Sequence, residues 1–404
     1  MGSLKPVVHV FQIGYGKWGK IAFKKFVQLS KELRDVNLIL EGICDIDPKA
    51  RADLEKIMEK EKLKTKIFSY TQDMYNYASG MNNVLIYDAS PGELHTSHVL
   101  KSIEYKFFHL AEKPPYLTKE DEEMVEKQDG NWGFDAIEYF NPAVLFAKRF
   151  LKEERINILS VETFRYNSIG LKKILHRDHR YGVQGGDILD KAIHEIYLLD
   201  FFDSVNMKLT DSKVDFFMIN SIENPKLVDI RLKNFGGKNP ATAQSNINGL
   251  AGKVPIGIHT GWLGVPDLDI VREIEKNTGK KIKFSKESEI NGKKFLDEEL
   301  RIFVIKGEKD GKPIEMYGDM KHFQFFLKGD EWKEITLEKN DQLYIVLRNA
   351  VYTTAGKEKF FIDRERIDSF SMFLFEARDK SLENPINPEG EAEKTREYIM
   401  KKLL

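Results

Sequence analysis

Three glycines that follow an apolar run near the N-terminus constrain the fold of this chain more than any other feature. Residues 7–13 read VVHVFQI, and Gly14, Gly16 and Gly19 lead directly into a segment of helical period. Gly14 permits a tight turn out of a strand, Gly16 lets backbone amides approach a pyrophosphate, and Gly19 lets the helix pack closely on the sheet. The amides that open such a helix are oriented to bind phosphate. The pattern therefore predicts a dinucleotide site.

Tyr15, Lys17 and Trp18 occupy the positions between the glycines. We expect their backbone amides to contribute more than their side chains, with Trp18 packing beneath the nucleotide. Glycines at this spacing also occur in ordinary strand-to-helix turns, where they serve the backbone alone.

A carboxylate at the end of the second apolar run favours the nucleotide interpretation. Residues 37–44 form that run, and Asp45 follows it. An acid at this place accepts both ribose hydroxyls and repels a 2'-phosphate, so it favours NAD over NADP. Asp45 could instead cap the next helix, but Asp47, directly before Pro48, fits the capping role better.

Composition sets the domain count and excludes some partners. At 404 residues the chain exceeds what one hydrophobic core usually serves. We expect a dinucleotide-binding domain over residues 1–130 and a second domain over residues 131–404. The 63 basic and 64 acidic residues nearly cancel, and no basic block stands out, which makes nucleic acid or a membrane an unexpected partner.

No apolar stretch approaches the roughly twenty residues of a membrane span, and no secretory signal is recognisable. A cytoplasmic location is the default expectation. The single cysteine, Cys44, excludes an internal disulfide and a thiolate metal cluster, so no metal site is predicted. We expect Cys44 to be buried in the second strand.

The order of strand-like and helix-like segments predicts an α/β fold with two different sheets. The first 115 residues alternate between the two, which favours a parallel sheet covered by helices on both faces. A sixth strand follows, reading GFDAIEYF. After Pro142 several strand-like runs follow one another closely, as in an antiparallel or mixed sheet. Residues 265–300 read as an insertion carrying a helix, and the tail from Arg364 is helical.

Four segments in this order resemble the glucose-fructose oxidoreductase and inositol dehydrogenase family (Gfo/Idh/MocA): GYGKWG, YDASPGELHTSHVLKSI, AEKPPYLT and GGDILDKAIH. The resemblance is clear over about the first 200 residues and rests on strand pattern alone beyond them. It implies a Rossmann domain followed by an α/β domain with a large, open, mostly antiparallel sheet. It also implies a homodimer or homotetramer formed through the uncovered face of that sheet.

The same resemblance gives Lys113 the role of an active-site lysine. Glu112, Lys113 and Pro114 lie where the fifth strand should end, at the sheet edge that binds ligands. An ammonium there can hydrogen-bond a carbinol oxygen and stabilise alkoxide-like charge. Glu112 either contacts the nicotinamide ribose or pairs with Lys113. An isolated lysine at a strand end would more often simply reach solvent.

Asp190 and His194 are four residues apart in a segment of helical period, so we expect them on one helix face together with Asp187 and Tyr197. Spacing alone favours a solvated polar face. The resemblance instead implies that His194 takes the hydroxyl proton as a general base and that Asp190 orients it.

Ser90 and Pro91 end the fourth strand, and His95 follows near the start of a helix. The resemblance implies that these three residues lie against the ribose and nicotinamide side of the cofactor. A helix N-terminal histidine without a ligand is an equally good interpretation of His95.

Some segments depart from the family pattern. Family members often carry an arginine shortly before the proline that opens the second domain. Here the residues before that proline are Tyr139, Phe140 and Asn141. Residues 177–181, RDHRY, either bind an acidic or phosphorylated sugar or form a solvated loop, which is the favoured interpretation. His259 and Trp262 are expected to be sheet residues.

Together these features predict an NAD-dependent oxidoreductase that acts on a secondary hydroxyl of a sugar, polyol or cyclic alcohol. One alternative is an enzyme that keeps NAD bound and uses transient oxidation for glycoside cleavage or sugar interconversion. Another is a sensor that binds NAD or sugar without turnover, although a sensor does not need Lys113, Asp190 and His194 together.

Overall fold

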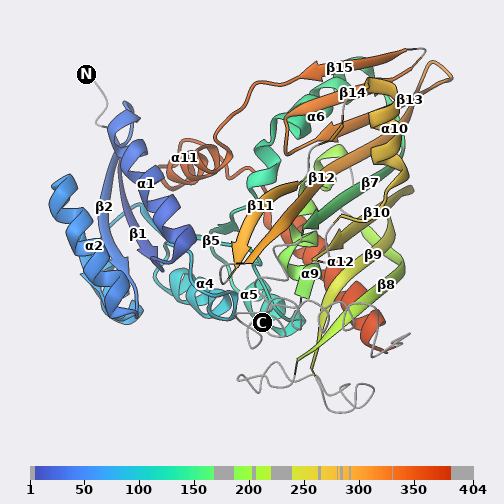
Figure 1. The fold of residues 1–404 in the computed structure, drawn as a ribbon. Coiled ribbons are helices and arrows are strands. Elements are labelled where there is room, and N and C mark those ends of the chain that lie inside the picture. The colour runs from blue at the N-terminus through green and yellow to red at the C-terminus, as the bar shows by residue number, and fades with distance from the viewer. Residues whose placement is uncertain are drawn as a thin grey trace. The chain divides into compact units, whose positions relative to one another are not determined.

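The chain forms two compact units in the computed structural model (Figure 1). The structure describes residues 5–167, 186–202, 206–219, 239–262, 265–279, 281–282, 285–290, 293–329 and 331–383. The first unit contains the residues up to Ile137 and a later segment, Asp341–Asp368. The second unit contains Glu138–Asn340 and the residues from Ser369 onward.

The first unit is built on a six-stranded parallel sheet with the order β3-β2-β1-β4-β5-β6. Chain connections run outward from β1 in one direction and from β4 in the other, so the strand order reverses between these two strands. In open sheets of this kind ligands bind beyond the carboxyl ends of the strands at such a reversal. The strands are β1 (Val7–Ile13), β2 (Asn37–Cys44), β3 (Lys66–Phe68), β4 (Val84–Asp88), β5 (Phe108–Ala111) and β6 (Trp132–Phe134).

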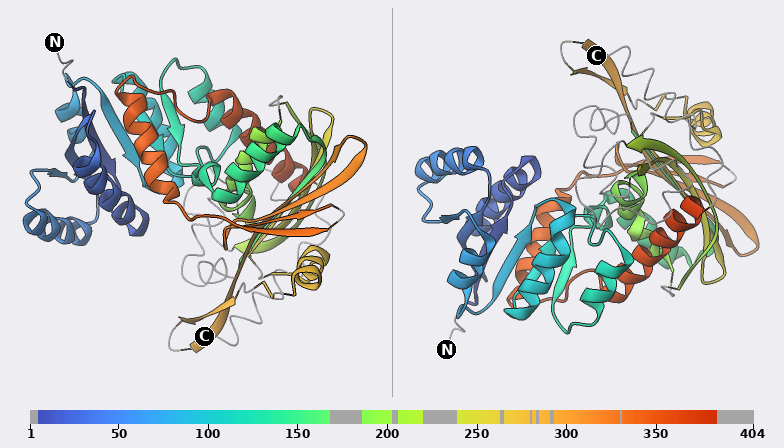
Figure 2. Two further views of the ribbon diagram at one scale, coloured as in Figure 1. Left: turned by 90° about the horizontal axis from the view of Figure 1, so that it is seen from above. Right: turned by 90° about the horizontal axis from the view of Figure 1, so that it is seen from below.

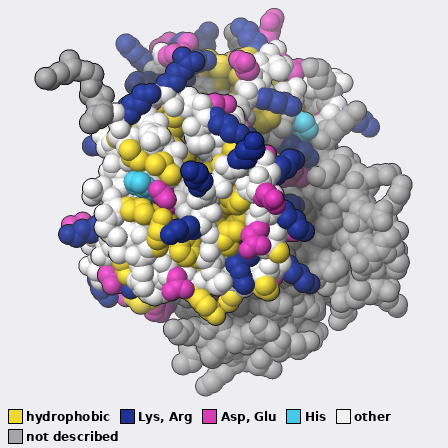
Figure 3. Space-filling view, turned by 90° about the vertical axis from the view of Figure 1, so that its left-hand side faces the viewer, with side chains coloured by type: hydrophobic (Ala, Val, Ile, Leu, Met, Phe, Trp, Pro, Cys, Tyr) yellow, Lys and Arg dark blue, Asp and Glu magenta, His cyan; other side chains and the backbone are white. Residues whose placement is uncertain are grey.

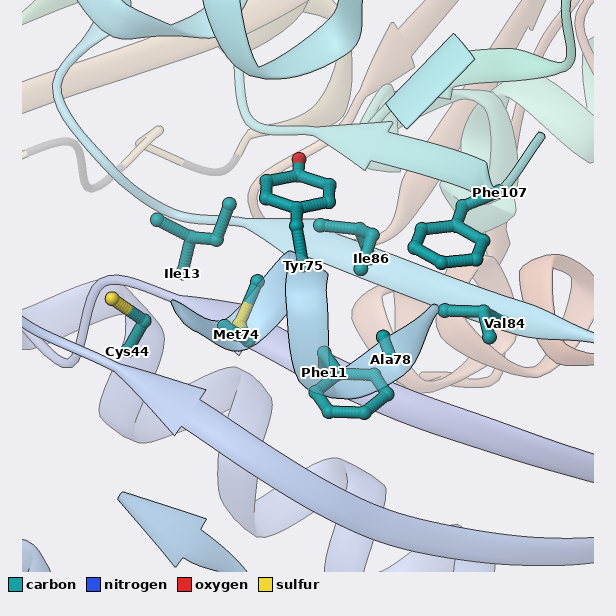
Figure 4. Packing of buried hydrophobic residues seen from close by; sticks show 9 residues of the cluster. All are labelled: Phe11, Ile13, Cys44, Met74, Tyr75, Ala78, Val84, Ile86 and Phe107. Atoms are coloured by element: carbon teal, nitrogen blue, oxygen red, sulfur yellow. The ribbon is translucent and has the colours of Figure 1, made fainter. Parts of the chain in front are cut away.

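Helices cover both faces of this sheet, as the alternating pattern predicted. Phe23 and Val27 of α1 and Leu54 of α2 pack with Ile43 on one face. Met74 and Tyr75 of α3 pack on the other face, in the cluster shown in Figure 4. The helices of the unit are α1 (Lys17–Glu32), α2 (Pro48–Glu61), α3 (Thr71–Ala78), η1 (Gly92–Leu94), α4 (His95–Glu104), α5 (Lys119–Glu126) and α11 (Gln342–Thr354).

Cys44 lies in the α3 cluster, free and buried, as expected. Burial raises the pKa of its thiol to about 12, so the thiol stays protonated at neutral pH.

Helix α11 explains why the units do not divide at residue 130 (Figures 1 and 2). It lies beside α1, where the Tyr344 hydroxyl donates to Oε2 of Glu32 at 2.7 Å. The Tyr352 hydroxyl donates to Oδ1 of Asp35 at 2.6 Å, and the Lys357 ammonium also contacts this carboxylate. These contacts return a segment from late in the sequence to the first unit, which local sequence pattern does not reveal.

The second unit is built on a nine-stranded, mostly antiparallel sheet. Its order is β15-β14-β13-β12-β7-β10-β9-β8, with β11 paired to β12, and the β7–β10 pair is parallel. The strands are β7 (Asn157–Asn167), β8 (Met207–Ile219), β9 (Asn239–Ala251), β10 (Val254–Gly261), β11 (Ser285–Ile290), β12 (Lys293–Lys309), β13 (Lys312–Asp319), β14 (Gln324–Lys328) and β15 (Trp332–Thr336).

One face of this sheet carries the helices that follow the first unit along the chain. Phe146 and Phe150 of α6 contact Phe325, and Phe201 of η3 contacts Phe303. The remaining elements are η2 (Ile137–Phe140), α6 (Pro142–Glu154), α9 (Gly186–Asp190), η3 (Ala192–Phe201), α10 (Asp269–Thr278) and α12 (Arg364–Glu383). The predicted sixth strand is therefore shorter than expected, because its second half forms η2.

The opposite face is partly covered by α10, the helix predicted within residues 265–300 (Figure 2). Val271 and Ile274 pack there against Phe164, Ile302 and Tyr317. Farther along this face, the His259 ring stacks on Phe164, with 4.8 Å between the centroids, and its Nδ1 donates to Oδ1 of Asn246 at 2.9 Å. Helix α10 thus covers part of the sheet face that the sequence analysis expected to be open. Formation of a homodimer or homotetramer stays a prediction.

The described surface carries mixed charge. On the face of the first unit shown in Figure 3, cationic, anionic and apolar side chains are interspersed. Within the described parts of the chain, no helix has the length and apolar character needed to cross a bilayer.

Candidate active site

The glycine loop of the first unit has the geometry of a phosphate-binding turn. Gly14 has a φ of +85°, and a Cβ there would lie 2.7 Å from the Ala89 carbonyl oxygen. A Cβ on Gly19 would lie 2.3 Å from the carbonyl oxygen of Gly14, whereas one on Gly16 would meet nothing within 4 Å. Helix α1 begins after Gly16 without a side-chain cap, so its first amides face outward for an anion. The Gln12 amide supports the turn by donating to the carbonyl oxygens of Gly14 and Gly19.

The side chains between the glycines take different positions. Tyr15 is buried and packs edge-on against Phe23, so it contributes to the loop through its backbone. Lys17 is exposed and Trp18 is half-buried. The indole Nε1 of Trp18 has no hydrogen-bond partner among the described residues.

Asp45 is fixed at the end of β2 by two backbone amides. The N–H of Tyr15 donates to its Oδ2 at 2.6 Å, and the N–H of Asp47 donates to its Oδ1 at 2.8 Å. Each oxygen keeps a second lone pair, which suits a carboxylate that accepts ribose hydroxyls. Asp47 instead caps α2, accepting from the N–H of Lys49 at 2.9 Å, as predicted.

Two apolar side chains near Asp45 were missed by sequence reasoning. Ile46, next to Asp45, is 80% exposed, and Tyr70, two residues after β3, is 66% exposed. The backbone N–H of Asp45 donates to the carbonyl oxygen of Phe68, which ties the two strand ends together. Exposed apolar groups beside this loop suit contact with an aromatic base. Their place two residues after the ends of β2 and β3 was the sequence signal that could have revealed them.

The β4 edge contains a polar cluster that the sequence only partly indicated. Asp88 accepts from the N–H of Ser90 at 2.9 Å, and its Oδ2 lies 2.7 Å from Nδ1 of His98. Although burial alone would raise the pKa of Asp88, the imidazole of His109, 3.6 Å away, and the hydrogen bond from His98 hold it well below the usual value. This cluster fixes the strand end at which Ser90 and Pro91 were predicted to meet the cofactor.

His95 does not present a ring nitrogen to a ligand in this structure. Its side chain is 1% exposed, with Nδ1 2.9 Å from the Pro114 carbonyl oxygen and Nε2 3.0 Å from that of Ser90. The predicted cofactor contact is corrected accordingly: His95 links the loops after β4 and β5, because both nitrogens face backbone carbonyls.

Lys113 and Glu112 lie directly after β5, at the same carboxyl edge as the glycine loop. Lys113 is half-buried, and its backbone N–H donates to Oε2 of Glu112 at 3.3 Å. Oε1 of Glu112 accepts from the Tyr87 hydroxyl at 3.0 Å.

Asp190 belongs to the second unit and lies at the end of α9. Its Oδ2 accepts a hydrogen bond from the indole Nε1 of Trp262 at 3.1 Å and lies 3.6 Å from the Lys191 ammonium. Asp190 and Trp262 are both buried. Trp262 was expected to be only a sheet residue, and it holds this carboxylate instead.

The predicted continuous helix through Asp190 and His194 is wrong. Helix α9 ends at Asp190, Lys191 lies between the two helices (φ −117°, ψ −53°), and the 3-10 helix η3 begins at Ala192. The rule that residues four apart share an α-helical face does not apply across this break. His194 lies in the first turn of η3 and is half-buried.

Asp187 and Tyr197 are not part of a solvated stripe, as the spacing had suggested. Asp187 is fully buried and accepts from the hydroxyls of Ser245 at 2.9 Å and Thr260 at 2.7 Å. Tyr197 is also buried and donates to Glu195 at 2.7 Å. These contacts anchor α9 and η3 to the sheet.

A buried ion-pair network beneath η3 was missed by sequence reasoning. Arg165 of β7 donates to Oε1 of Glu195 at 2.5 Å and to Oε1 of Glu138 at 2.7 Å. Arg301 of β12 reaches the same Glu138 oxygen at 3.1 Å. Glu195 directly follows His194, so Arg165 holds the helix turn that carries the histidine. No local pattern signals a pair 30 residues apart.

The segment that replaces the family arginine is structural. Asn141 caps α6 through the N–H of Ala143 and donates to the carbonyl oxygen of Met320 at 2.9 Å. The Tyr139 hydroxyl donates to the carbonyl oxygen of Ile196 at 3.4 Å. Residues 177–181 lie outside the described residues.

Comparison with known proteins identifies the architecture. No protein-family model matches the sequence, and no curated protein matches it. Solved structures do match over almost the whole chain. Levoglucosan dehydrogenase, in complex with NADH and levoglucosan, is 12% identical with a TM-score of 0.66, covering 93% of this chain and 97% of its own. The chain thus shares the fold of this dehydrogenase.

Two further Gfo/Idh/MocA-type structures show the same likeness. The WlbA dehydrogenase from Bordetella pertussis, in complex with NADH and UDP-GlcNAcA, is 15% identical with a TM-score of 0.64, covering 94% of this chain and 98% of its own. UDP-N-acetylglucosamine 3-dehydrogenase GnnA from Acidithiobacillus ferrooxidans is 12% identical with a TM-score of 0.60, covering 92% and 97%. The resemblance predicted from four short segments is thus confirmed for the fold.

Proposed function

We propose that this protein is an NAD-dependent oxidoreductase that transfers hydride between nicotinamide and a secondary hydroxyl of a sugar, polyol or cyclic alcohol. The observation that carries the proposal lies in the first unit. A complete phosphate-binding loop with a fixed Asp45 shares its sheet edge with Lys113. The structures of similar fold include sugar dehydrogenases crystallised with NADH, which supports the same class of reaction.

The residues of the first unit fit the cofactor. The amides at the start of α1 would hold its pyrophosphate, and the Asp45 carboxylate would accept the hydroxyls of the adenosine ribose. Ile46 and Tyr70 offer apolar surface to the adenine. The Asp45 charge disfavours a 2'-phosphate, so we propose NAD rather than NADP. When bound, NAD supplies the hydride acceptor.

We assign the chemistry on the substrate to three side chains. His194 takes the hydroxyl proton, Asp190 orients its imidazole, and Lys113 stabilises the negative charge that develops on the carbinol oxygen. Asp190 is suited to an orienting role because Trp262 and Lys191 fix its carboxylate. Lys113 belongs to the first unit and the other two residues belong to the second, so their convergence on one substrate is part of the proposal.

A substrate screen tests this function. The purified protein is incubated with NAD and a panel of sugars and polyols, and formation of reduced nicotinamide is followed by absorbance. We expect reduction with at least one member of the panel and little with NADP. Binding of NAD without turnover on any member would favour the sensor alternative. Conversion of a sugar without net NAD reduction would favour the alternative that uses transient oxidation.

A further inference from the structure

Two buried side chains that the proposed mechanism does not use surround Glu112. The Tyr87 hydroxyl, from β4, lies 3.0 Å from Oε1 of Glu112 and 3.3 Å from Oδ2 of Asp135. Asp135 follows β6, and its N–H donates to the Ala111 carbonyl oxygen at 2.7 Å. This bond extends the β5–β6 ladder by one step, and the Tyr87 hydroxyl lies within hydrogen-bond distance of both carboxyl groups.

Burial affects the protonation of the Glu112 and Asp135 carboxyl groups. Tyr87 is 0% exposed, Asp135 is 2% exposed and Glu112 is half-buried. If Asp135 is ionised, its Oδ1 can only accept a hydrogen bond, and no described residue donates one to it. A proton on the Glu112 carboxyl would supply that donor. Two ionised carboxylates that meet at one Tyr87 hydroxyl, largely shielded from water, would be strongly disfavoured, because each loses hydration and repels the other.

We propose that Glu112 and Asp135 share one proton, so that the pair carries a single negative charge and Glu112 acts as a positioning residue for the Lys113 ammonium. The electrostatics agree with this geometry. Burial and the neighbouring Asp135 raise the pKa of Glu112 well above its usual value, and burial raises that of Asp135 to about 6. The assignment to positioning rests on the proposed function, whereas the shared proton does not.

The shared proton determines the strength of the electrostatic attraction between the Lys113 ammonium and Glu112. The neighbouring groups that affect the pKa of Glu112 are Asp135, Lys113 and Tyr87. With one proton on the pair, Glu112 donates to Asp135 and the negative charge rests farther from Lys113. Loss of that proton would place a full carboxylate beside Lys113 and draw the ammonium away from the substrate oxygen. We therefore expect kcat to fall at alkaline pH as the pair loses its proton.

Infrared spectroscopy of the whole protein tests the shared proton without any substrate. At neutral pH we expect the C=O stretch of a protonated carboxyl that disappears in both Asp135→Asn and Glu112→Gln. Glu122 is another buried carboxyl, and burial raises its pKa to about 7. The control Glu122→Gln removes that contribution and should leave the band that depends on Asp135. A parent band that Asp135→Asn and Glu112→Gln both leave unchanged would overturn the proposal.

Kinetics test the positioning role with the best substrate of the panel. In Asp135→Asn, Glu112 no longer faces a like charge and ionises at lower pH. We expect kcat to fall about tenfold at neutral pH, with the alkaline limb of the pH profile displaced toward acid pH and the Kd for NAD little changed. An unshifted pH profile together with an Asp135-dependent infrared band would refute the positioning role alone. Absence of turnover in the parent would count against the proposed function and leave the infrared result standing.

Discussion

The indole of Trp262 donates a hydrogen bond to the Asp190 carboxylate across 3.1 Å, with both side chains buried. Trp262→Phe keeps an aromatic ring and removes this donor. Because a hydrogen bond to a charged group contributes roughly 1.5–3 kcal/mol, we expect kcat to fall by at least about tenfold while NAD binding is unchanged. Steady-state kinetics and a cofactor titration measure the two effects.

Trp332→Phe is the matched control for that variant. Trp332 stacks on Tyr317 in the region of the sheet that α10 covers, away from Asp190. It should leave kcat near the parent value. Equal losses of kcat in both variants would contradict the specific role given to Trp262.

The two glycines of the loop should respond differently to the same substitution. Gly19→Ala places a Cβ 2.3 Å from a backbone oxygen, so we expect the free protein to melt at a lower temperature and to bind NAD weakly. Gly16→Ala meets nothing within 4 Å, so the free protein should melt as the parent does. Its added methyl group should still weaken NAD binding, because the backbone at this position approaches the pyrophosphate. Unchanged NAD affinity in Gly16→Ala would contradict this placement.

Asp45→Asn tests the cofactor preference. The change removes the charge and keeps an acceptor for the Tyr15 amide, which donates to Asp45 at 2.6 Å. We expect NAD affinity to fall about tenfold and the ratio of NADP to NAD affinity to rise. Asp47→Asn alters the neighbouring helix cap and should leave that ratio unchanged. Equal NAD and NADP affinity in the parent would contradict the role of Asp45.

Glu122 makes stability depend on pH with a definite sign. Burial raises its pKa from 4.5 to about 7, so the folded state holds a proton that the unfolded state has released. Its contribution to the free energy of unfolding therefore decreases as pH rises from about 4.5 to about 7 and is constant above that range. Glu122→Gln should match the parent near pH 4 and be more stable near pH 8. Denaturant unfolding at both pH values measures the difference, and an equal difference at both would refute the assignment.

Local sequence signals predicted the parts of the fold and site that depend on local geometry. The glycine spacing and Asp45 are tied to the backbone of one strand-turn-helix unit, and the structure places them accordingly. The strand pattern after Pro142 likewise predicted a mostly antiparallel sheet, because each run carries its own period and turns.

Features that depend on distant contacts were not predictable in this way. The helix break at Lys191 follows the burial of Asp187 and Asp190 against the sheet, which overrides a helical period. The Arg165–Glu195 pair and the return of α11 to the first unit also join segments far apart in sequence. Glu112 was correctly placed at a strand end, but Asp135 follows a different strand, β6, and only the sheet order brings the two residues together.

The central claim is that Lys113 and His194 act on one substrate beside bound NAD. The most direct measurement compares NAD reduction and NAD binding in the parent, Lys113→Ala and His194→Ala. We predict that both variants lose NAD reduction, by at least about a hundredfold, and retain NAD affinity within a few fold of the parent. A variant that still reduces NAD at the parent rate would contradict the account.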